Sequence, residues 1–199
     1  MAEYEQVRFQ AARAWPDWLA KAVEADLDPW CGAYSYVFPI DEKEVVKLVW
    51  EPGALAYLRM CQTAGGALPH LPMVTEVLTD VAEFEGRAHS AVRMERLRSG
   101  GTAMDAFADE YALHVRSIDD GELSNVILSA YALRQCAQQW RTTRRTLSAC
   151  LLLLADEVET NDWAADMGND ENWMIRPRDG VVVLSDPVHG VEWFADDLV

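Results

Sequence analysis

Short apolar runs that alternate with polar residues recur through the first half of the chain. They are rich in β-branched and aromatic residues, and glycine pairs at 65–66 and 100–101 interrupt them, as expected for strands separated by turns. The predicted strands are Tyr34–Pro39, Glu44–Trp50, Met73–Leu78 and Ser90–Leu97. Between the second and third of them, Glu51–Thr63 has apolar residues at helical spacing, with Pro52 near its first turn. The pattern predicts a mainly antiparallel sheet with one inserted helix.

The remaining segments have the spacing of helices. From Glu5 to Asp26 apolar residues recur near this spacing, and Pro16 marks a kink or a break between two helices. A short helix is predicted between Ala103 and Val115, and one long or two consecutive helices within 122–159. We therefore expect an α+β protein with an N-terminal helical segment at 1–29, a strand-rich lobe at 30–98 and a helical lobe at 99–199. The N-terminal segment is expected to pack across the strand lobe.

Composition and charge narrow the classes of partner. The chain has 199 residues, half of them hydrophobic, which is enough for a sizeable core in one domain or one two-lobed unit. A net charge of −16 disfavours nonspecific binding to nucleic acids or to anionic membranes, because both need clustered Lys and Arg. The same charge permits basic partners or mimicry of DNA, although the acidic residues are dispersed along the chain.

Cysteine spacing and the lack of targeting signals bear on two further classes, zinc-binding proteins and secreted or membrane proteins. The four cysteines and the four histidines have no metal-ligand spacing, so no zinc site is expected. The chain shows no signal peptide and no apolar run of membrane-spanning length. These features predict a cytoplasmic protein with no membrane partner.

Candidate chemistry lies in the last part of the chain. Asp166 is followed by Asn172, then by a short apolar run, and then by Asp186. Kinase-like phosphotransferases build their catalytic and metal-binding loops from a carboxylate, a nearby Asn, a strand and a second Asp. In that arrangement Asp166 would accept a hydroxyl proton, while Asn172 and Asp186 would bind Mg²⁺ beside the ATP phosphates. The alternative interpretation is an Asx-rich turn before a strand.

A nucleotide site also needs groups from the strand lobe. Lys47 interrupts an apolar strand, and a buried ammonium needs an anion that nucleotide phosphates would supply, unless the strand lies at an edge and the side chain reaches water. Gly32 would let a hairpin backbone approach the phosphates, or it is only a turn glycine. Met94 would lie at the back of an adenine pocket, or it is ordinary core. The backbone from Glu95 to Leu97 would pair with the adenine edge.

From about Trp30 to Val188 the chain resembles the kinase domain of the early host-shutoff protein kinase of short-tailed coliphages and its phage relatives. The similar segments are Gly32–Ser35, Val46-Lys47, Gly53–Tyr57 with Arg59-Met60, Leu71–Val74, Asp166-Met167 with Asn172 and Met174, and Ser185–Val188. The resemblance implies a minimal two-lobed protein-kinase-like fold with a truncated C-terminal lobe. It also implies ATP- and Mg²⁺-dependent phosphorylation of Ser or Thr in host proteins during infection, in the cytoplasm of the host bacterium.

Three features depart from the kinase pattern. Five residues rather than four separate Asp166 from Asn172, no Glu lies in the middle of the helix after Lys47, and the chain ends 13 residues after Asp186. These departures leave open a catalytically weak pseudokinase that binds and inhibits a host enzyme such as RNA polymerase. A third hypothesis is an acidic DNA mimic or antidefence protein without a nucleotide site. Small-molecule phosphotransfer is a further enzymatic variant.

Overall fold

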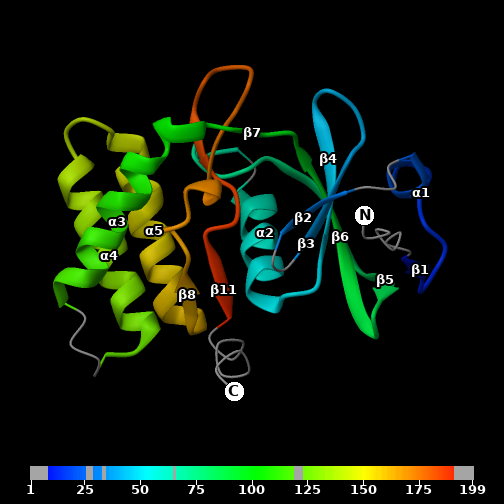
Figure 1. Ribbon diagram of the computed structural model, residues 1–199, viewed down its shortest axis with the longest axis horizontal. Coiled ribbons are helices and arrows are strands. Elements are labelled where there is room, and N and C mark those ends of the chain that lie inside the picture. The colour runs from blue at the N-terminus through cyan, green and yellow to red at the C-terminus, as the bar shows by residue number, and fades with distance from the viewer. Residues whose placement is uncertain (1–8, 26–28, 33–34, 65, 119–122, 191–199) are drawn as a thin grey trace, which may run out of the picture.

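The computed structural model describes residues 9–25, 29–32, 35–64, 66–118 and 123–190. A large sheet and a group of helices lie on opposite sides of the molecule, with one helix and short strands between them (Figure 1). The predicted α+β class is confirmed, and the arrangement is compatible with two lobes. The division of the chain at residues 29 and 98 stays a prediction.

The large sheet has six strands and is antiparallel at each pairing. Its strands are β1 (Gln10–Ala11), β2 (Trp30–Gly32), β3 (Ser35–Pro39), β4 (Glu44–Val49), β5 (Val74–Phe84) and β6 (Arg87–Glu95). They lie in the order β1-β5-β6-β4-β3-β2. Helix α2 (Pro52–Ala64) comes between β4 and β5 in the chain. The antiparallel sheet with one inserted helix is therefore confirmed.

Alternation along β4 decides which face of the sheet each side chain covers. Val46 and Leu48 belong to the core cluster that includes Leu19 of helix α1 (Asp17–Ala25). Val45 and Val49 belong to the other cluster, which includes α2 and the helices beyond it. Because side chains alternate along a strand, Lys47 lies on the same face as Val45 and Val49. The lysine is thus directed toward the interior between the sheet and the helices.

The N-terminal segment differs from the prediction before Pro16. Helix α1 begins only at Asp17, while Gln10 and Ala11 form β1, an extra strand at the edge of β5. The extra strand forms because the backbone groups at the open edge of β5 need hydrogen-bond partners. The same edge also binds the residues after β1: the Val81 carbonyl accepts hydrogen bonds from the Ala12 N–H (3.0 Å) and the Trp15 indole N–H (2.7 Å). The expected packing of this segment across the strands is confirmed for α1. Residues 5–8 lie outside the described part of the chain.

The helical side of the molecule contains α3 (Asp105–Ile118), α4 (Asn125–Trp140) and α5 (Arg145–Asn161), preceded by the short 3-10 helix η1 (Gly101–Ala103). Segment 122–159 therefore holds two helices rather than one. The short strands are β7 (Arg98–Ser99), β8 (Trp163–Ala165), β9 (Trp173–Ile175), β10 (Val182–Leu184) and β11 (Val188–Gly190), and η2 (Asp170–Asn172) is a 3-10 turn. β8 pairs with β11, and β9 lies between β10 and β7. Within the described residues, no helix has the length and apolar character needed to cross a membrane.

Three histidines in this fold predict a pH dependence of stability. Burial lowers the pKa of His70, His89 and His189 from the ordinary value of 6.5. His89 is 1% exposed, and its ring packs against Phe9 and Tyr36. A histidine whose folded pKa is depressed leaves stability intact above the unfolded pKa and reduces it as the pH falls, because the unfolded chain then binds more protons.

We therefore expect the urea midpoint of unfolding to be constant near pH 7.5 and to fall steadily between about pH 6.5 and 5.5. This window lies above the ordinary pKa values of the carboxylates, so histidines dominate it. The variant His89→Phe keeps an aromatic ring in the cluster and should show a smaller fall than the wild type. A midpoint that does not change between pH 7.5 and 5.5 would contradict the prediction.

Candidate functional site

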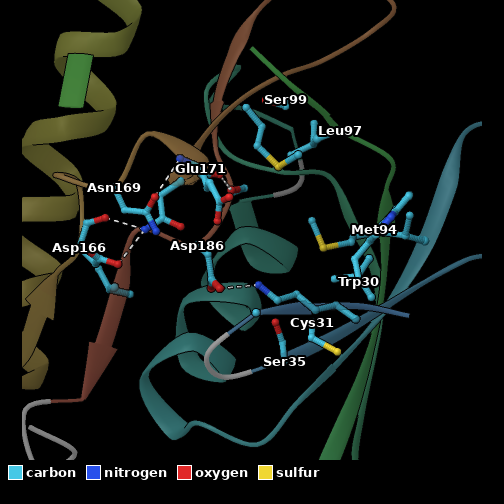
Figure 2. Close-up of a pocket in the computed structure, with 18 of the residues that line it drawn as sticks. Trp30, Cys31, Ser35, Met94, Leu97, Ser99, Asp166, Asn169, Glu171 and Asp186 are labelled. Carbon is cyan, nitrogen blue, oxygen red and sulfur yellow. Dashed lines mark hydrogen bonds and ion pairs between the residues drawn. The ribbon is translucent and has the colours of Figure 1, made fainter. Parts of the chain in front are cut away.

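A cavity of about 520 Å³ lies between the large sheet and the loops around Asp166 and Asp186 (Figure 2). Its size is within the range of small-molecule sites in proteins. The cavity brings together every residue predicted for the site: Gly32, Lys47, Met94, Glu95, Asp166, Asn172 and Asp186. One end is mostly apolar, with side chains from the sheet, and the other is polar, with side chains from the two loops.

The centre of the cavity is an ion pair that joins the two sides of the molecule. The Lys47 Nζ lies 2.7 Å from the Asp186 Oδ2, and Lys47 is 7% exposed. Lys47 comes from β4, which is paired on both sides, so the alternative of a lysine on an edge strand reaching water is wrong. The other carboxylate oxygen of Asp186, Oδ1, is buried and has no hydrogen-bond partner among the described residues. A buried carboxylate oxygen in this state is suited to bind a cation.

One strand pairing and two backbone hydrogen bonds hold the loops of Asp166 and Asp186 side by side. Asp166 directly follows β8 and Asp186 lies between β10 and β11, so the pairing of β8 with β11 places the two loops together. Two backbone hydrogen bonds link them: the Asp166 N–H donates to the Pro187 carbonyl at 2.9 Å, and the Ser185 N–H donates to the Asn172 carbonyl at 3.0 Å. Asp166 and Asp186 are 20 positions apart in the sequence, and this backbone pairing brings both of them to the same cavity.

Asn172 contacts Asp166 in spite of the extra residue between them. The Asn172 Nδ2 donates to the Asp166 carbonyl at 2.6 Å and to the Asp166 Oδ2 at 3.1 Å. The 3-10 turn η2 absorbs the additional residue, and Asn169 supports this turn by accepting a hydrogen bond from the Glu171 N–H at 3.0 Å. Because the Asn172 nitrogen is used inside the loop, its Oδ1 is the atom of that side chain that remains for a metal ion.

Buried aromatic residues fix the loop from behind. Trp173 is 1% exposed, and its indole N–H donates to the Met167 carbonyl at 2.8 Å. Its ring packs against Phe107 of α3, with 5.0 Å between ring centroids. On the other side of the loop, the Ser129 Oγ of α4 accepts a hydrogen bond from the Ala165 N–H at 2.8 Å. The loop is thus attached to two helices, and the polar atoms of Asp166 and Asn172 are held in place.

Helix α2 contacts the loop of Asp186 through a buried tyrosine. The absence of a Glu in the middle of α2 is evident in the structure, where Arg59 instead donates to the Thr79 hydroxyl at 2.8 Å. Tyr57 is completely buried, and its hydroxyl donates to the Leu184 carbonyl at 2.5 Å, two residues before Asp186. Burial raises the pKa of Tyr57 well above its ordinary value, so the hydroxyl stays protonated. The helix therefore positions the Asp186 loop through Tyr57.

Glu51 provides a second link that the sequence analysis missed. It is 0% exposed, and its Oε1 accepts hydrogen bonds from the Gly53 N–H at 2.9 Å and from the Gly190 N–H at 2.8 Å. The carboxylate caps the start of α2 and binds this start to β11. A signal was present in the sequence, because an acid directly before Pro52 at the first helical position is typical of a capped helix start.

The start of α2 lies so close to β11 that a side chain on Gly53 would clash with it. A Cβ on Gly53 would lie 2.6 Å from the Gly190 N and 2.8 Å from the His189 carbonyl carbon, which are backbone atoms that cannot rotate away. We expect Gly53→Ala to lower the free energy of unfolding by about 1–3 kcal/mol, although Ala is normally favoured over Gly in helices. Chemical denaturation measures this change. Gly168→Ala is the control, because its Cβ would meet nothing within 4 Å, and an equal loss there would contradict the steric account.

The apolar end of the cavity suits a flat ring. Val37, Val45, Met94, Leu97 and Met174 line it, and Met94 is 5% exposed. Gly32 also lines the cavity, although a Cβ there would make only ordinary contacts, the nearest at 3.6 Å from the Ser35 Oγ. Gly32 is therefore not required by the protein's own packing. Residues 33–34, between β2 and β3, lie outside the described part of the chain.

Glu95 differs in part from its predicted role. Its carboxylate forms an ion pair with Arg176, with 2.7 Å between the Arg176 Nε and the Glu95 Oε2. Its backbone N–H donates to the Met73 carbonyl at 2.9 Å, and the next N–H, of Arg96, donates to the Lys43 carbonyl at 2.7 Å. The backbone N–H groups of Glu95 and Arg96 are therefore used inside the protein. A bound base would have to use other polar atoms of segment 95–97.

No family model, curated protein or solved structure matches the chain.

The donor atoms fit Mg²⁺ only in the presence of further oxygen ligands. In the described part of the chain, no three His, Cys, Asp or Glu side chains come together in a way that could hold a metal ion. Asp186 and Asn172 offer one carboxylate and one amide oxygen, which are hard ligands suited to Mg²⁺. Magnesium is usually bound by one or two carboxylates together with waters and substrate phosphates. The residues thus fit a metal that arrives with a phosphorylated ligand.

Proposed function

We propose that the protein is a kinase-like phosphotransferase that binds ATP with Mg²⁺ and transfers the γ-phosphate to Ser or Thr hydroxyls of host proteins. The observation that carries the proposal is the Lys47–Asp186 pair across the cavity, together with the contact between Asn172 and Asp166. A cation from the sheet, two carboxylates and an amide are among the groups that kinase-like phosphoryl transfer uses. The resemblance to phage host-shutoff kinases supports the same function.

Each residue would have a distinct part in binding. The Lys47 ammonium would pair with phosphate oxygens, and Asp186 and Asn172 would hold the Mg²⁺. The metal would neutralise charge on the phosphates. The apolar wall around Met94 would hold the adenine ring. The buried Lys47 would not need to be desolvated on binding, because it is already 7% exposed and paired.

In the chemical step the acceptor hydroxyl oxygen would form a bond to the γ-phosphorus, and the bond between that phosphorus and the β,γ-bridging oxygen would break. ADP would leave with the electron pair of that bond. The hydroxyl proton would pass to the Asp166 carboxylate and then to solvent. Asp166 is exposed, so both the acceptor and water can reach it.

Mg-ATP binding is the first test of this proposal. We expect the wild type to be stabilised by Mg-ATP, by about 2.7 kcal/mol when the ligand is at 100 times its Kd. Lys47→Met and Asp186→Asn should lose most of this stabilisation in a thermal-shift assay. Asn is preferred to Ala at 186 because it keeps a partner for the buried Lys47. Lys43→Met, at an exposed lysine of the β3–β4 turn, is the control.

The outcome of this test is decisive for the nucleotide site. Equal stabilisation of the wild type and Lys47→Met would place any bound nucleotide elsewhere. No stabilisation of the wild type by millimolar Mg-ATP would overturn the proposal.

A non-catalytic variant of the same site is the second candidate, because no glutamate lies in the middle of α2, where Tyr57 or Arg59 occupies the expected position. With no glutamate partner, Lys47 pairs with Asp186, the residue that would hold the metal. Such a pseudokinase would bind and inhibit a host enzyme such as RNA polymerase. The acidic DNA-mimic hypothesis has less support, since Lys47 faces Asp186 rather than solvent.

A further inference from the structure

A second hollow, of about 350 Å³, lies beside Asp166 and helices α3 and α4. Asp166 and His189 line both spaces. Helices α3 and α4 form most of the remaining lining, together with Gly168 and two residues of β8; the helical residues are Tyr111, Ala112, Val115, Arg116, Asn125, Leu128 and Ser129. A group bound in one space and a group bound in the other would therefore both lie beside Asp166.

The charge of this hollow differs from that of the protein as a whole. Arg116 and Asp166 are the charged side chains that line it, and no ion pair joins them. Arg116 is exposed, and like several other arginines of the described residues, such as Arg145, it has no carboxylate partner. It is the one Lys or Arg among the residues that line the hollow, so an acidic group bound there would meet its charge.

The lining of the hollow, partly apolar and partly exposed, suits a segment of a protein chain. Leu128 and Val115 form an apolar wall, and Ser129 lies at the buried end near β8. Arg116 and Asn125 are exposed, so this part of the lining faces solvent. A longer chain can therefore place one side chain in the hollow and continue along the surface past Arg116.

We propose that this second hollow is the acceptor site, and that it takes a Ser or Thr hydroxyl from a protein segment with an acidic residue beside it. The acidic residue pairs with Arg116, and the hydroxyl reaches the Asp166 carboxylate from this hollow. The hydroxyl oxygen bonds to the γ-phosphorus, its proton goes to Asp166, and ADP departs with the electrons of the broken bond. This inference rests on the proposed phosphotransferase function.

The test fills the hollow without altering the nucleotide cavity. Ala112 lines only the second hollow, so Ala112→Phe obstructs it with a residue that a helix accepts. Ala106→Phe is the matched control, because Ala106 is exposed on the same helix and lines neither space. The probe is a short fluorescent peptide with one Ser between two Glu residues, and a second peptide has Lys in place of each Glu. Fluorescence anisotropy measures peptide binding, and radiolabelled ATP measures transfer.

We expect the wild type to bind and phosphorylate the Glu peptide better than the Lys peptide. Ala112→Phe should weaken binding of the Glu peptide and transfer to it by about tenfold or more, with the thermal shift by Mg-ATP unchanged. Arg116→Glu should lower the affinity for the Glu peptide by about threefold to fivefold and raise that for the Lys peptide. A role of Arg116 in stabilising the end of α3 would not depend on peptide charge.

The possible results separate this inference from the proposed function. Mg-ATP binding with equal Glu-peptide binding in Ala112→Phe and the wild type overturns the acceptor site alone. Transfer to small hydroxy acids but not to either peptide overturns the protein acceptor. If Mg-ATP does not bind, the phosphotransferase proposal fails and the hollow is at most a peptide-binding site. Anisotropy that then shows no loss in Ala112→Phe overturns that site as well.

Discussion

Asp166→Asn is expected to lower the rate of phosphotransfer by about 10²–10⁴-fold and to leave Mg-ATP binding unchanged. The substitution removes the base but preserves the shape and an oxygen that can accept the hydrogen bond from Asn172. The fold should be unaffected, because the exposed side chain supports no core residue and its backbone N–H still donates to Pro187. Radiolabel transfer into a host lysate measures the rate, and a thermal shift measures nucleotide binding.

The control for this variant is Asp170→Asn, an exposed carboxylate in the same loop that lines neither space. It changes the net charge by the same amount, so it should retain the wild-type rate. The pseudokinase account makes a different prediction for Asp166→Asn, namely full inhibition of host growth. Full biological activity in this variant, with transfer abolished, would rule out catalysis as the mechanism and favour binding to a host enzyme.

The elements that could be predicted are those with short-range patterns. The apolar run of β4 indicated a strand but left two alternatives for Lys47, burial beside an anion or an edge position with the side chain in water, and the structure shows the first. The order of carboxylate, Asn, strand and Asp indicated that the two loops would meet at one site, and the pairings of β8–β11 and β9–β10 bring them together. The expected roles of these residues in catalysis stay a prediction.

The elements that could not be predicted depend on contacts between distant parts of the chain. Strand β1 exists because β5 has an open edge, and no pattern of two residues predicts this. Helical spacing alone extended the N-terminal helical segment too far, since Phe9 and Trp15 pack against the core of the sheet without being in a helix. Tyr57 and Glu51 act through backbone groups more than 120 residues away, at Leu184 and Gly190. Such partners have no signature in a single sequence.

Arg176 is the clearest of these distant contacts, and it joins the two sides of the molecule. It is 3% exposed, and its guanidinium binds both carboxylate oxygens of Glu95, at 2.7 and 2.8 Å. It also donates to the carbonyls of Pro69 (2.8 Å) and Leu71 (3.0 Å). Hydrogen bonding to Glu95 raises the pKa of Arg176, so it stays charged. Arg176 follows β9, while Glu95 ends β6 beside Met94.

Arg176→Met is therefore expected to lower the free energy of unfolding by about 3–5 kcal/mol, because Glu95 would be left as a mostly buried charge without its partner and two carbonyls would lose their donor. Arg178→Met is the control, since the Arg178 side chain is 62% exposed and should contribute within about 0.5 kcal/mol. Adding Glu95→Gln to Arg176→Met should recover part of the loss, as removing both charges costs less than removing one. Urea denaturation measures all four proteins. A loss of unfolding free energy below about 1 kcal/mol in Arg176→Met would contradict a stabilising role of the Arg176 contacts. A loss of about 3–5 kcal/mol with unchanged Mg-ATP affinity would show that these contacts stabilise the fold without shaping the cavity.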